Sequence, residues 1–169
     1  LCDSYAHQFT GANGIIENMR SVKDDHEIDF IKTACDIATT AFLEILPSIK
    51  VGQTEKMIRN ILEQRMRDLG ADDVAFATIV ATGPNSAIPH HEPTDRAISS
   101  GDLIKVDFGA KIAGYHSDCT RTLVLGKPLE WQVDLHSAVT TAQVAGRTAI
   151  GPNVCFVDVE ESVNQSLTA

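Results

Sequence analysis

Two strand-like segments joined by a turn constrain the fold of this chain more than any other feature. They read LIKVDFGA and GYHSDCTRTLVL. Both alternate between apolar and polar residues, which is the period of a strand with one buried face. If the turn is centred between Ile112 and Ala113, antiparallel pairing places Asp107 directly opposite Asp118 on the polar face. The sequence therefore predicts a β-hairpin that brings two carboxylates together.

The predicted pairing of Asp107 with Asp118 raises an electrostatic problem. Side chains directly opposite each other in an antiparallel pair have Cβ atoms about 4.5–5.5 Å apart, and like charges at that separation repel each other. A divalent cation between the carboxylates removes the repulsion, and carboxylate oxygens are ligands that such ions prefer. In the alternative interpretation both aspartates face water on an exposed hairpin, with Lys105 or Arg121 nearby. Spacing alone does not decide between the two.

Two amphipathic helices are predicted before the hairpin. Asp24 and Glu27 have the spacing of a capping box, and apolar residues recur at helical intervals from there to about residue 48. A second helix is expected from about Thr54, with one apolar face and Gly70 as its end. Residues 1–20 show no clear period and are interpreted as a linker or the tail of an N-terminal domain.

The other segments complete an α+β pattern. DVAFATIVATG is apolar and β-branched enough for a strand, and the proline-rich PNSAIPHHEPTDRAISSGD is a long loop that its surroundings must hold in place. A further helix is predicted over about 129–150, and CFVDVEESVNQSLT has the pattern of one more helix at its opening.

Composition excludes several kinds of partner. The chain has 169 residues, 43% of them apolar, and a formal net charge of -9 at pH 7. That charge argues against nucleic acid and against a membrane as partners, because both select clustered Lys and Arg. The sequence shows no run long enough to span a membrane and no signal segment, and its four cysteines are scattered without a C-x-x-C pair. These features predict a cytoplasmic protein whose cysteines are small buried residues.

One long run, ATGPNSAIPHHEPTDRAISSGDLIKVDFGAKIAGYHSDCTRTLVLGKP, resembles the catalytic core of the pita-bread metallopeptidases, and within them the branch of Xaa-Pro dipeptidase and aminopeptidase P. The matching motifs are Gly83-Pro84-Asn85-Ser86, Pro89-His90, Pro93, Asp95-Arg96, Gly101-Asp102, Asp107-x-Gly109-Ala110 and Gly114-Tyr115-x-Ser117-Asp118-x-Thr120-Arg121-Thr122. MRSVKDDHEIDFIKTACDIA upstream looks like the opening of the family's catalytic domain, so the resemblance covers nearly the whole chain.

The resemblance implies an α+β pita-bread fold, of which this chain carries the first half: two helices, an antiparallel sheet with the hairpin, and a further helix. Residues 21–169 would form this half of the catalytic domain, preceded by 1–20 as the linker or tail. A half-domain would expose sheet edge and apolar helix faces, which favours self-association.

The resemblance also implies a metal centre. In the family two Asp, one His and two Glu hold two metal ions; Asp107 and Asp118 match the two aspartates by position. His90 matches the histidine that lines the substrate site and stabilises the tetrahedral intermediate. The other three ligands have no match and are expected beyond residue 169. The residues that lie in the wrong contexts to replace them are His136, Glu160 and Glu161.

Thr120, Thr122 and His116 share the polar face of the hairpin with the aspartates. Thr120 and Thr122 are expected to orient Asp118. His116 is expected to support the metal site as a neighbour of its ligands or to line the rim of the substrate site, and the alternative is that it is merely exposed. For His91, the neighbour of His90, a loop residue without a role is expected, because only the residue directly after Pro89 matches the family motif.

By resemblance, the whole enzyme would remove one residue from the N-terminus of peptides whose second residue is proline, using two divalent ions, Mn, Co or Zn. Short peptides of that kind are the expected partners, and a homo-oligomer is the expected assembly. Because three ligands are missing, the chain alone is expected to bind metal weakly or not at all and to be inactive.

Two other functions stay open. A pita-bread scaffold that no longer cleaves would bind peptides or protein partners, since a fold does not fix a function. Methionine aminopeptidase is a rival within the peptidases, although PHHEPTDRAISSGD and SDCTRT are more similar to the proline-directed branch.

Overall fold

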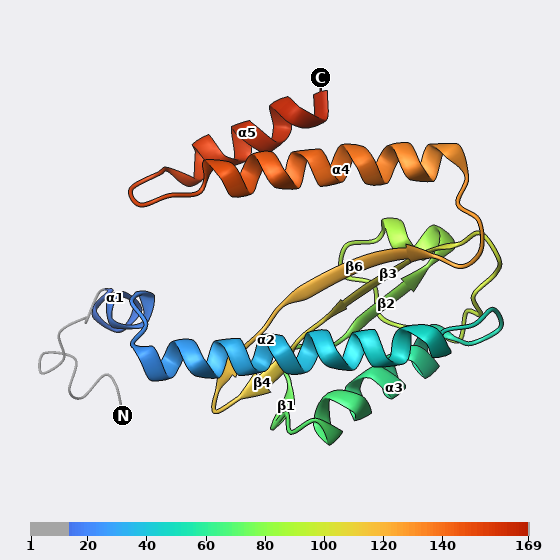
Figure 1. Cartoon of the computed structure of the whole chain (residues 1–169), viewed down its shortest axis with the longest axis horizontal. Coiled ribbons are helices and arrows are strands. Elements are labelled where there is room, and N and C mark those ends of the chain that lie inside the picture. Colours follow the sequence, from blue (N-terminus) through green and yellow to red (C-terminus); the bar gives the residue numbers. More distant parts are fainter. Residues whose placement is uncertain (1–13, 169) are drawn as a thin grey trace, which may run out of the picture. The chain divides into compact units, whose positions relative to one another are not determined.

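The structure, a computed structural model, describes residues 14–168, so most of the predicted linker lies outside the described residues. The helices and strands follow in the order α1 (Ile15–Ser21), α2 (Asp25–Ile45), η2 (Leu46–Ser48), α3 (Glu55–Asp68), β1 (Asp73–Val74), β2 (Ile79–Thr82), η3 (Gly83–Ala87), β3 (Leu103–Phe108), β4 (Ala110–Ile112), β5 (Tyr115–His116), β6 (Cys119–Val124), α4 (Glu130–Ala149) and α5 (Phe156–Thr168) (Figure 1). The chain divides into two compact units. The first comprises the described residues up to Ser48 with Arg59–Thr78 and Asp107–Thr120, and the second comprises the remainder.

Helix α2 of the first unit begins where the sequence predicts. Asp24 Oδ1 accepts a hydrogen bond from the Glu27 amide at 2.9 Å, and Glu27 Oε2 accepts one from the Asp24 amide at 2.7 Å, so the predicted capping box is confirmed. The buried face consists largely of small residues: Ala34, Ala38, Ala41, Phe42 and Ile45. Cys35, predicted to be buried, is exposed, because the contact face runs through the alanines beside it.

The sequence predicts helix α3 but not the short helix α1. α3 ends two residues before Gly70, whose φ of 102° is the left-handed conformation expected of a helix stop. Its apolar face buries Leu62 and Met66 fully, while Ile61 is 40% exposed. α1 lies in a segment where no element was predicted, and it buries none of its residues, so no periodic face was there to reveal it.

The hairpin turn lies one residue later than predicted. In β4 and β5, Ile112 pairs with Tyr115 and Lys111 with His116, so the turn is formed by Ala113 and Gly114. Both turn residues have positive φ, 50° and 86°, as a two-residue hairpin turn that matches the strand twist requires. The prediction centred on Ile112 and Ala113 is therefore wrong by one position, because alanine is a rare residue at positive φ.

The hairpin is also divided between two sheets, in the order β1-β4-β5 and β2-β3-β6. The break falls at Gly109, where a Cβ atom would collide with the backbone carbonyl oxygen of Ser117. Ser117 stabilises the crossing: its hydroxyl accepts a hydrogen bond from the Ala110 amide at 2.9 Å and donates to the Ala34 carbonyl at 3.1 Å. A buried serine on the apolar side of the hairpin thus has a structural purpose.

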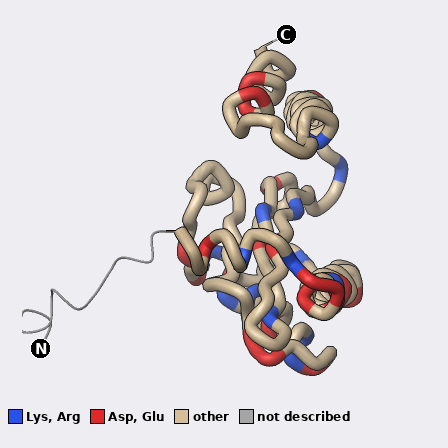
Figure 2. Tube along the Cα trace, turned by 90° about the vertical axis from the view of Figure 1, so that its left-hand side faces the viewer, with Lys and Arg blue, Asp and Glu red and all other residues tan. Residues whose placement is uncertain are grey.

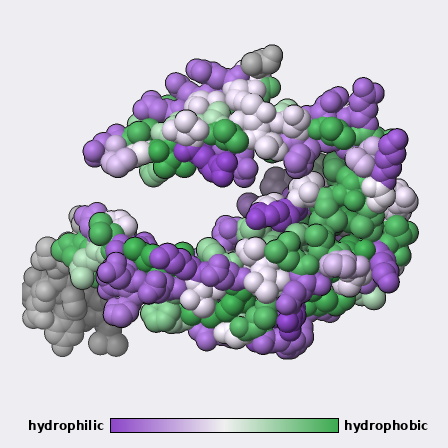
Figure 3. All heavy atoms as spheres, viewed as in Figure 1, coloured by the Kyte–Doolittle hydropathy of each residue, from purple (hydrophilic) through white to green (hydrophobic). Residues whose placement is uncertain are grey.

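In the second unit, all four residues of β2 are buried and β3 alternates between half-buried and buried residues, with Ile104 and Val106 fully buried. α4 and α5 pack against each other, and Gly146 allows the approach of Val163. These two helices confirm the predictions made for the end of the chain. They leave large apolar side chains on the surface, including Trp131, Val133, Leu135, Val139, Phe156 and Val157. Figure 3 shows green, apolar atoms among the surface atoms of these two helices. Self-association through them stays a prediction.

Acidic residues lie at separate places along the chain, α5 among them, rather than in one run (Figure 2). Within residues 14–168, no helix is both long enough and apolar enough to cross a membrane.

Candidate active site

The structure brings Asp107 and Asp118 together. Asp107 is the fifth residue of β3, and Asp118 lies in the short break between β5 and β6. The pKa of Asp118 is raised above its usual value, first by partial loss of hydration, then by the negative charge of Asp107 and a hydrogen bond between the two side chains. A pair of carboxylates of this kind favours a cation beside it.

Thr120 contacts this carboxylate pair. Its hydroxyl donates a hydrogen bond to Asp107 Oδ1 at 3.0 Å. The contact agrees with the register of the turn, in which the numbers of opposite residues sum to 227, as for Lys111 with His116. In this register Thr120 lies opposite Asp107, so the predicted direct pairing of Asp107 with Asp118 is wrong by two positions. Because alternate residues share a face, moving the turn by one residue leaves both aspartates on the predicted face. That Thr120 orients Asp118 stays a prediction.

The donor set fits part of a metal site. Carboxylate oxygens suit hard divalent ions, which take six or more ligands in the case of Ca²⁺ and usually keep several waters in the case of Mg²⁺. Among the residues that the structure describes, no group of three or more His, Cys, Asp and Glu side chains is placed to hold a metal ion. Among the described residues, Asp107 and Asp118 could therefore supply two ligands to a metal ion, but no third His, Cys, Asp or Glu side chain joins them.

Lys105, which the alternative interpretation placed beside the aspartates, is engaged with a different segment. Its ammonium group donates hydrogen bonds to the carbonyl oxygens of Ile88 at 2.6 Å and Pro89 at 3.2 Å. Two of its three N–H donors thus hold the backbone directly before His90.

His90 lies in the second unit, in the loop between β2 and β3, and is exposed. The next residue, His91, is held firmly: its side chain is only 9% exposed and its Nε2 lies 2.8 Å from Glu55 Oε2. The prediction that His91 has no role is therefore wrong as regards structure. Among the predicted site residues, the structure brings together Asp107, Asp118 and Thr120, while His90 belongs to the other unit.

Glu55, at the start of α3, is a residue that the sequence analysis missed. It is 0% exposed, and its carboxylate is surrounded by six donors. Oε1 accepts from the Thr82 amide at 2.8 Å, the Thr82 hydroxyl at 2.9 Å and Asn85 Nδ2 at 3.0 Å. Oε2 accepts from His91 Nε2 at 2.8 Å, the Thr94 amide at 2.9 Å and the Thr94 hydroxyl at 2.7 Å.

The donors around Glu55 decide its charge. Burial alone would raise the pKa of this carboxyl, but the hydrogen bonds from His91, Asn85 and Thr94 outweigh burial and lower the pKa to about 2. A sequence signal for it existed: Glu55 precedes Ile58 by three positions and Leu62 by seven, so helical periodicity puts it on the buried face. A carboxylate on such a face requires partners.

The loop has a second anchor in motif residues that the resemblance singled out. Arg96 Nη1 donates to Asp102 Oδ2 at 2.7 Å and to the Thr82 hydroxyl at 2.6 Å. Gly83 leaves room for this guanidinium, since a Cβ atom there would come within 2.5 Å of Arg96 Nη2. Asp102 also accepts from the Ser99 amide at 2.9 Å. The motif residues between β2 and β3 thus fix the shape of the loop.

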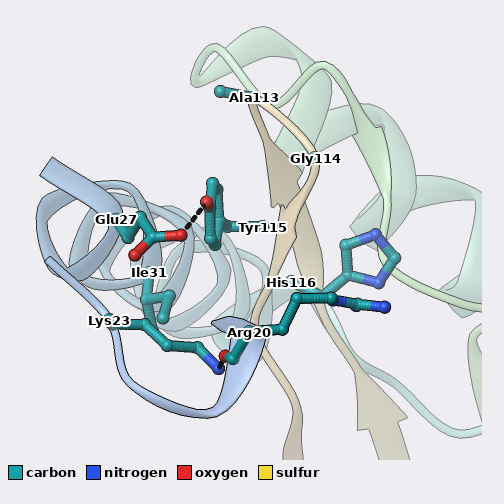
Figure 4. A pocket seen from close by; sticks show the side chains of 8 residues that line it. All are labelled: Arg20, Lys23, Glu27, Ile31, Ala113, Gly114, Tyr115 and His116. Atoms are coloured by element: carbon teal, nitrogen blue, oxygen red, sulfur yellow. Dashed lines mark hydrogen bonds between the residues drawn. The ribbon is translucent and has the colours of Figure 1, made fainter. Parts of the chain in front are cut away.

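His116 lies in a separate hollow of the first unit, with a volume of about 560 Å³ (Figure 4). The lining includes Arg20 and Lys23 from the end of α1 and the segment after it. At its side Tyr115 donates a hydrogen bond to Glu27 Oε1 at 2.6 Å and stacks on Phe30, with 5.7 Å between ring centroids. His116 therefore shares this hollow with two cations, and the predicted support of the metal site stays untested.

The sequence of this chain is similar to those of known peptidases. The chain is 40% identical over 154 residues to the uncharacterised peptidase YqhT of Bacillus subtilis, covering 91% of the chain and 44% of that protein. It is 36% identical over 153 residues to a Xaa-Pro dipeptidase of Pyrococcus horikoshii, covering 90% of the chain and 44% of that protein.

Solved structures show the same likeness. An X-Pro aminopeptidase from Thermotoga maritima superposes with a TM-score of 0.92 at 38% identity, over 95% of this chain and 46% of that one. For a prolidase from Pyrococcus furiosus the TM-score is 0.90 at 33% identity, over 95% of this chain and 48% of that one. The chain thus spans less than half the length of these relatives.

Helices combined with sheets in this arrangement define the α+β pita-bread fold of metallopeptidases, as predicted. The sequence profile of metallopeptidase family M24 matches residues 29–169, and the chain belongs to that family. Membership implies the use of divalent metal, and the carboxylate pair is compatible with it.

Proposed function

We propose that this chain is part of a metal-dependent exopeptidase that removes one residue from the N-terminus of peptides with proline in second position. The observation that carries the proposal is the carboxylate pair Asp107 and Asp118. It is supported by the 36% sequence identity between this chain and a Xaa-Pro dipeptidase. A site for proline is required because the bond before proline is a tertiary amide with distinct geometry.

In this proposal Asp107 and Asp118 hold divalent ions, with Mn, Co and Zn as candidates, and Thr120 orients Asp107. A metal bound there would supply Lewis acidity at the scissile carbonyl and lower the pKa of water. His90 would donate a hydrogen bond to the developing oxyanion, an interaction worth about 3 kcal/mol in comparable sites. Residues 1–20 would be the linker or tail of a preceding domain, and 21–169 the first half of the catalytic domain.

The proposal includes the prediction that residues 1–169 are inactive alone. One His and two Glu ligands would be encoded after Ala169, the histidine within a His-Gly motif. Reading the gene beyond that codon tests this directly. A coding sequence that continues without such residues would instead support a scaffold that binds peptides without cleaving them.

Metal binding by the chain is tested by calorimetry with MnCl₂. We expect weak binding, with a dissociation constant of about 0.1–1 mM, because two carboxylates leave most coordination positions to water. Asp107→Ala should abolish it. Asp134→Ala, which removes an exposed aspartate on α4, is the matched control for adsorption to an acidic protein and should leave binding unchanged. Equal binding by Asp107→Ala and the native chain would remove Asp107 from the metal site.

A further inference from the structure

The segment around His90 is fixed from two sides although it contains no regular structure between Ile88 and Ala97. On one side Lys105 of β3 holds the carbonyl oxygens of Ile88 and Pro89. On the other side Glu55 of α3 holds the imidazole of His91. His90 therefore stands between two anchors that come from different elements of the same unit.

Of these two anchors, Glu55 organises the larger part of the segment. Its six hydrogen bonds come from only four residues, and they reach both ends of the stretch from Thr82 to Thr94. Both threonines donate through the backbone amide and the hydroxyl at once. A single carboxylate therefore ties the end of β2 to the residues that follow His91.

The chemistry of the site requires a carboxylate. Three of the six contacts are made by groups that can only donate, the Thr82 and Thr94 amides and Asn85 Nδ2, and an ionised carboxylate is an acceptor at both oxygens. Since Glu55 offers no proton, His91 must carry a proton on Nε2 to make the contact at 2.8 Å. A glutamine at this position would turn an NH₂ group toward donors and could not replace either oxygen without losing partners.

We propose that Glu55 is a positioning residue for His90: its carboxylate keeps the proton of His91 on Nε2 and clamps the segment 82–94 in one conformation. The anchoring itself is independent of metal and peptide. Only its consequence for catalysis rests on the proposed function, in which His90 contacts the reacting carbonyl. The competing explanation is that Glu55 stabilises the unit as a whole without any particular effect on this segment.

Amide hydrogen exchange on the 169-residue chain separates these explanations. We expect Glu55→Gln to accelerate exchange in 82–94 at least about tenfold while the amides of α2 change less than about twofold, because α2 belongs to the other unit and can open with the Glu55 contacts intact. Glu44→Gln is the matched control: it removes one oxygen of an exposed carboxylate paired with Arg65 and should change neither region. Uniform acceleration in both regions, or none in 82–94, would overturn the proposal.

A second measurement needs no variant and so holds even if Glu55→Gln fails to fold. Two-bond ¹H–¹⁵N spectra of the native imidazoles should show the His91 proton on Nε2, and the ¹⁵N order parameter of the His90 amide should be about 0.85, as in rigid backbone. An unprotonated Nε2 at His91 or a His90 order parameter below about 0.6 would contradict the proposal. Neither readout involves metal, so these results bear on Glu55 alone, while the manganese calorimetry bears on the proposed function.

Discussion

Two carboxylate sites in this chain have opposite electrostatic character. At Glu55 one buried carboxylate meets six donors, and its pKa falls to about 2. At the hairpin two carboxylates, Asp107 and Asp118, share a hydrogen bond with each other, and the pKa of Asp118 is raised. The protein supplies more donors than a carboxylate commonly receives at the first site, whereas at the second the negative charge of Asp107 makes ionisation of Asp118 less favourable.

The difference separates a structural site from a candidate functional one. A site whose charge is fully balanced within the chain stabilises the fold and needs no ligand. A site whose charge is unbalanced lowers stability until a ligand binds, which is typical of functional centres. Changes of charge at the two sites should therefore have opposite effects on stability.

The largest expected effect is the acid sensitivity of the Glu55 site. Because the folded-state pKa of about 2 lies below the usual value of 4.5, the ionised carboxylate contributes its full stabilisation above pH 4.5 and loses it as the pH falls toward 2. The difference between the two pKa values corresponds to at most about 3 kcal/mol. Urea denaturation of the native chain and Glu55→Gln should show free energies of unfolding that converge over this range.

Glu44→Gln provides the comparison for that experiment. Its carboxylate pairs with Arg65 on the surface, where ion pairs contribute little, so its difference from the native chain should stay small at every pH. A difference between native chain and Glu55→Gln that is constant from pH 7 to about pH 2.5 would show that Glu55 stabilises the fold by packing and not by charge.

The second largest effect should come from Gly109, which acts on the aspartate pair through the backbone. An alanine Cβ would collide with the Ser117 carbonyl and lie 3.0 Å from the Ala75 Cβ, so the crossing of the two hairpin strands must open. We expect Gly109→Ala to lower the free energy of unfolding by about 1–3 kcal/mol and to weaken manganese binding.

The control for Gly109→Ala is Gly151→Ala, where the nearest side-chain atom would be 3.5 Å away, an ordinary contact. Its free energy of unfolding should stay within about 0.5 kcal/mol of the native value. If both glycine variants behave alike, the crossing at Ser117 does not require glycine.

Local sequence pattern predicts the hairpin that carries Asp107 and Asp118, but it does not predict the Glu55 site. The capping box at Asp24 and the alternation of the hairpin are short-range signals, and both correctly indicated the elements. The predicted face of the two aspartates is still correct although the turn was predicted one residue too early. The error moves each residue's partner on the opposite strand by two positions, and side chains two positions apart in a strand lie on the same face. Local pattern therefore correctly indicated that Asp107 and Asp118 come together, while their role as a ligand site stays a prediction.

The balanced site was missed because its partners come from far along the chain. Glu55 is separated from its donors by 27 to 39 residues, and no local period reports such contacts. The exposed Cys35 and the crossing at Gly109 have the same origin: small residues form the contact surfaces, and hydrophobicity does not distinguish a buried alanine from an exposed one.

At the pair Asp107 and Asp118, replacing one aspartate by an uncharged residue should stabilise the protein when no metal is present. The raised pKa of Asp118 means that its ionised form costs stability, an effect present at neutral pH and relieved as the pH falls through the folded-state pKa. We expect Asp118→Asn to raise the free energy of unfolding in EDTA by less than about 1 kcal/mol, since the site is near solvent. With manganese in excess, the advantage should shrink or reverse because only the native chain gains from binding.

Asp134→Asn serves as the control, because this exposed aspartate on α4 has no carboxylate neighbour along its helix face within four residues except Glu130. Its effect should be smaller than that of Asp118→Asn and independent of manganese. Destabilisation by Asp118→Asn in EDTA would mean that the aspartate pair is already balanced and that the contrast with Glu55 does not hold.

The smallest effect should come from Thr120→Val, which tests whether the Thr120 hydroxyl orients the Asp107 carboxylate for binding a metal ion. Thr120→Val keeps the shape and removes the donor at 3.0 Å, so stability should change by less than about 1 kcal/mol. The dissociation constant for manganese should rise about three- to tenfold, because a ligand that has lost its orienting partner binds metal less well. Thr122→Val tests the other threonine that the sequence pattern singled out on this strand face, and we expect the dissociation constant to stay unchanged because the observed hydrogen bond to Asp107 comes from Thr120. Equal loss in both variants would attribute the effect to the strand, and no loss in either would leave Asp107 oriented by the backbone alone.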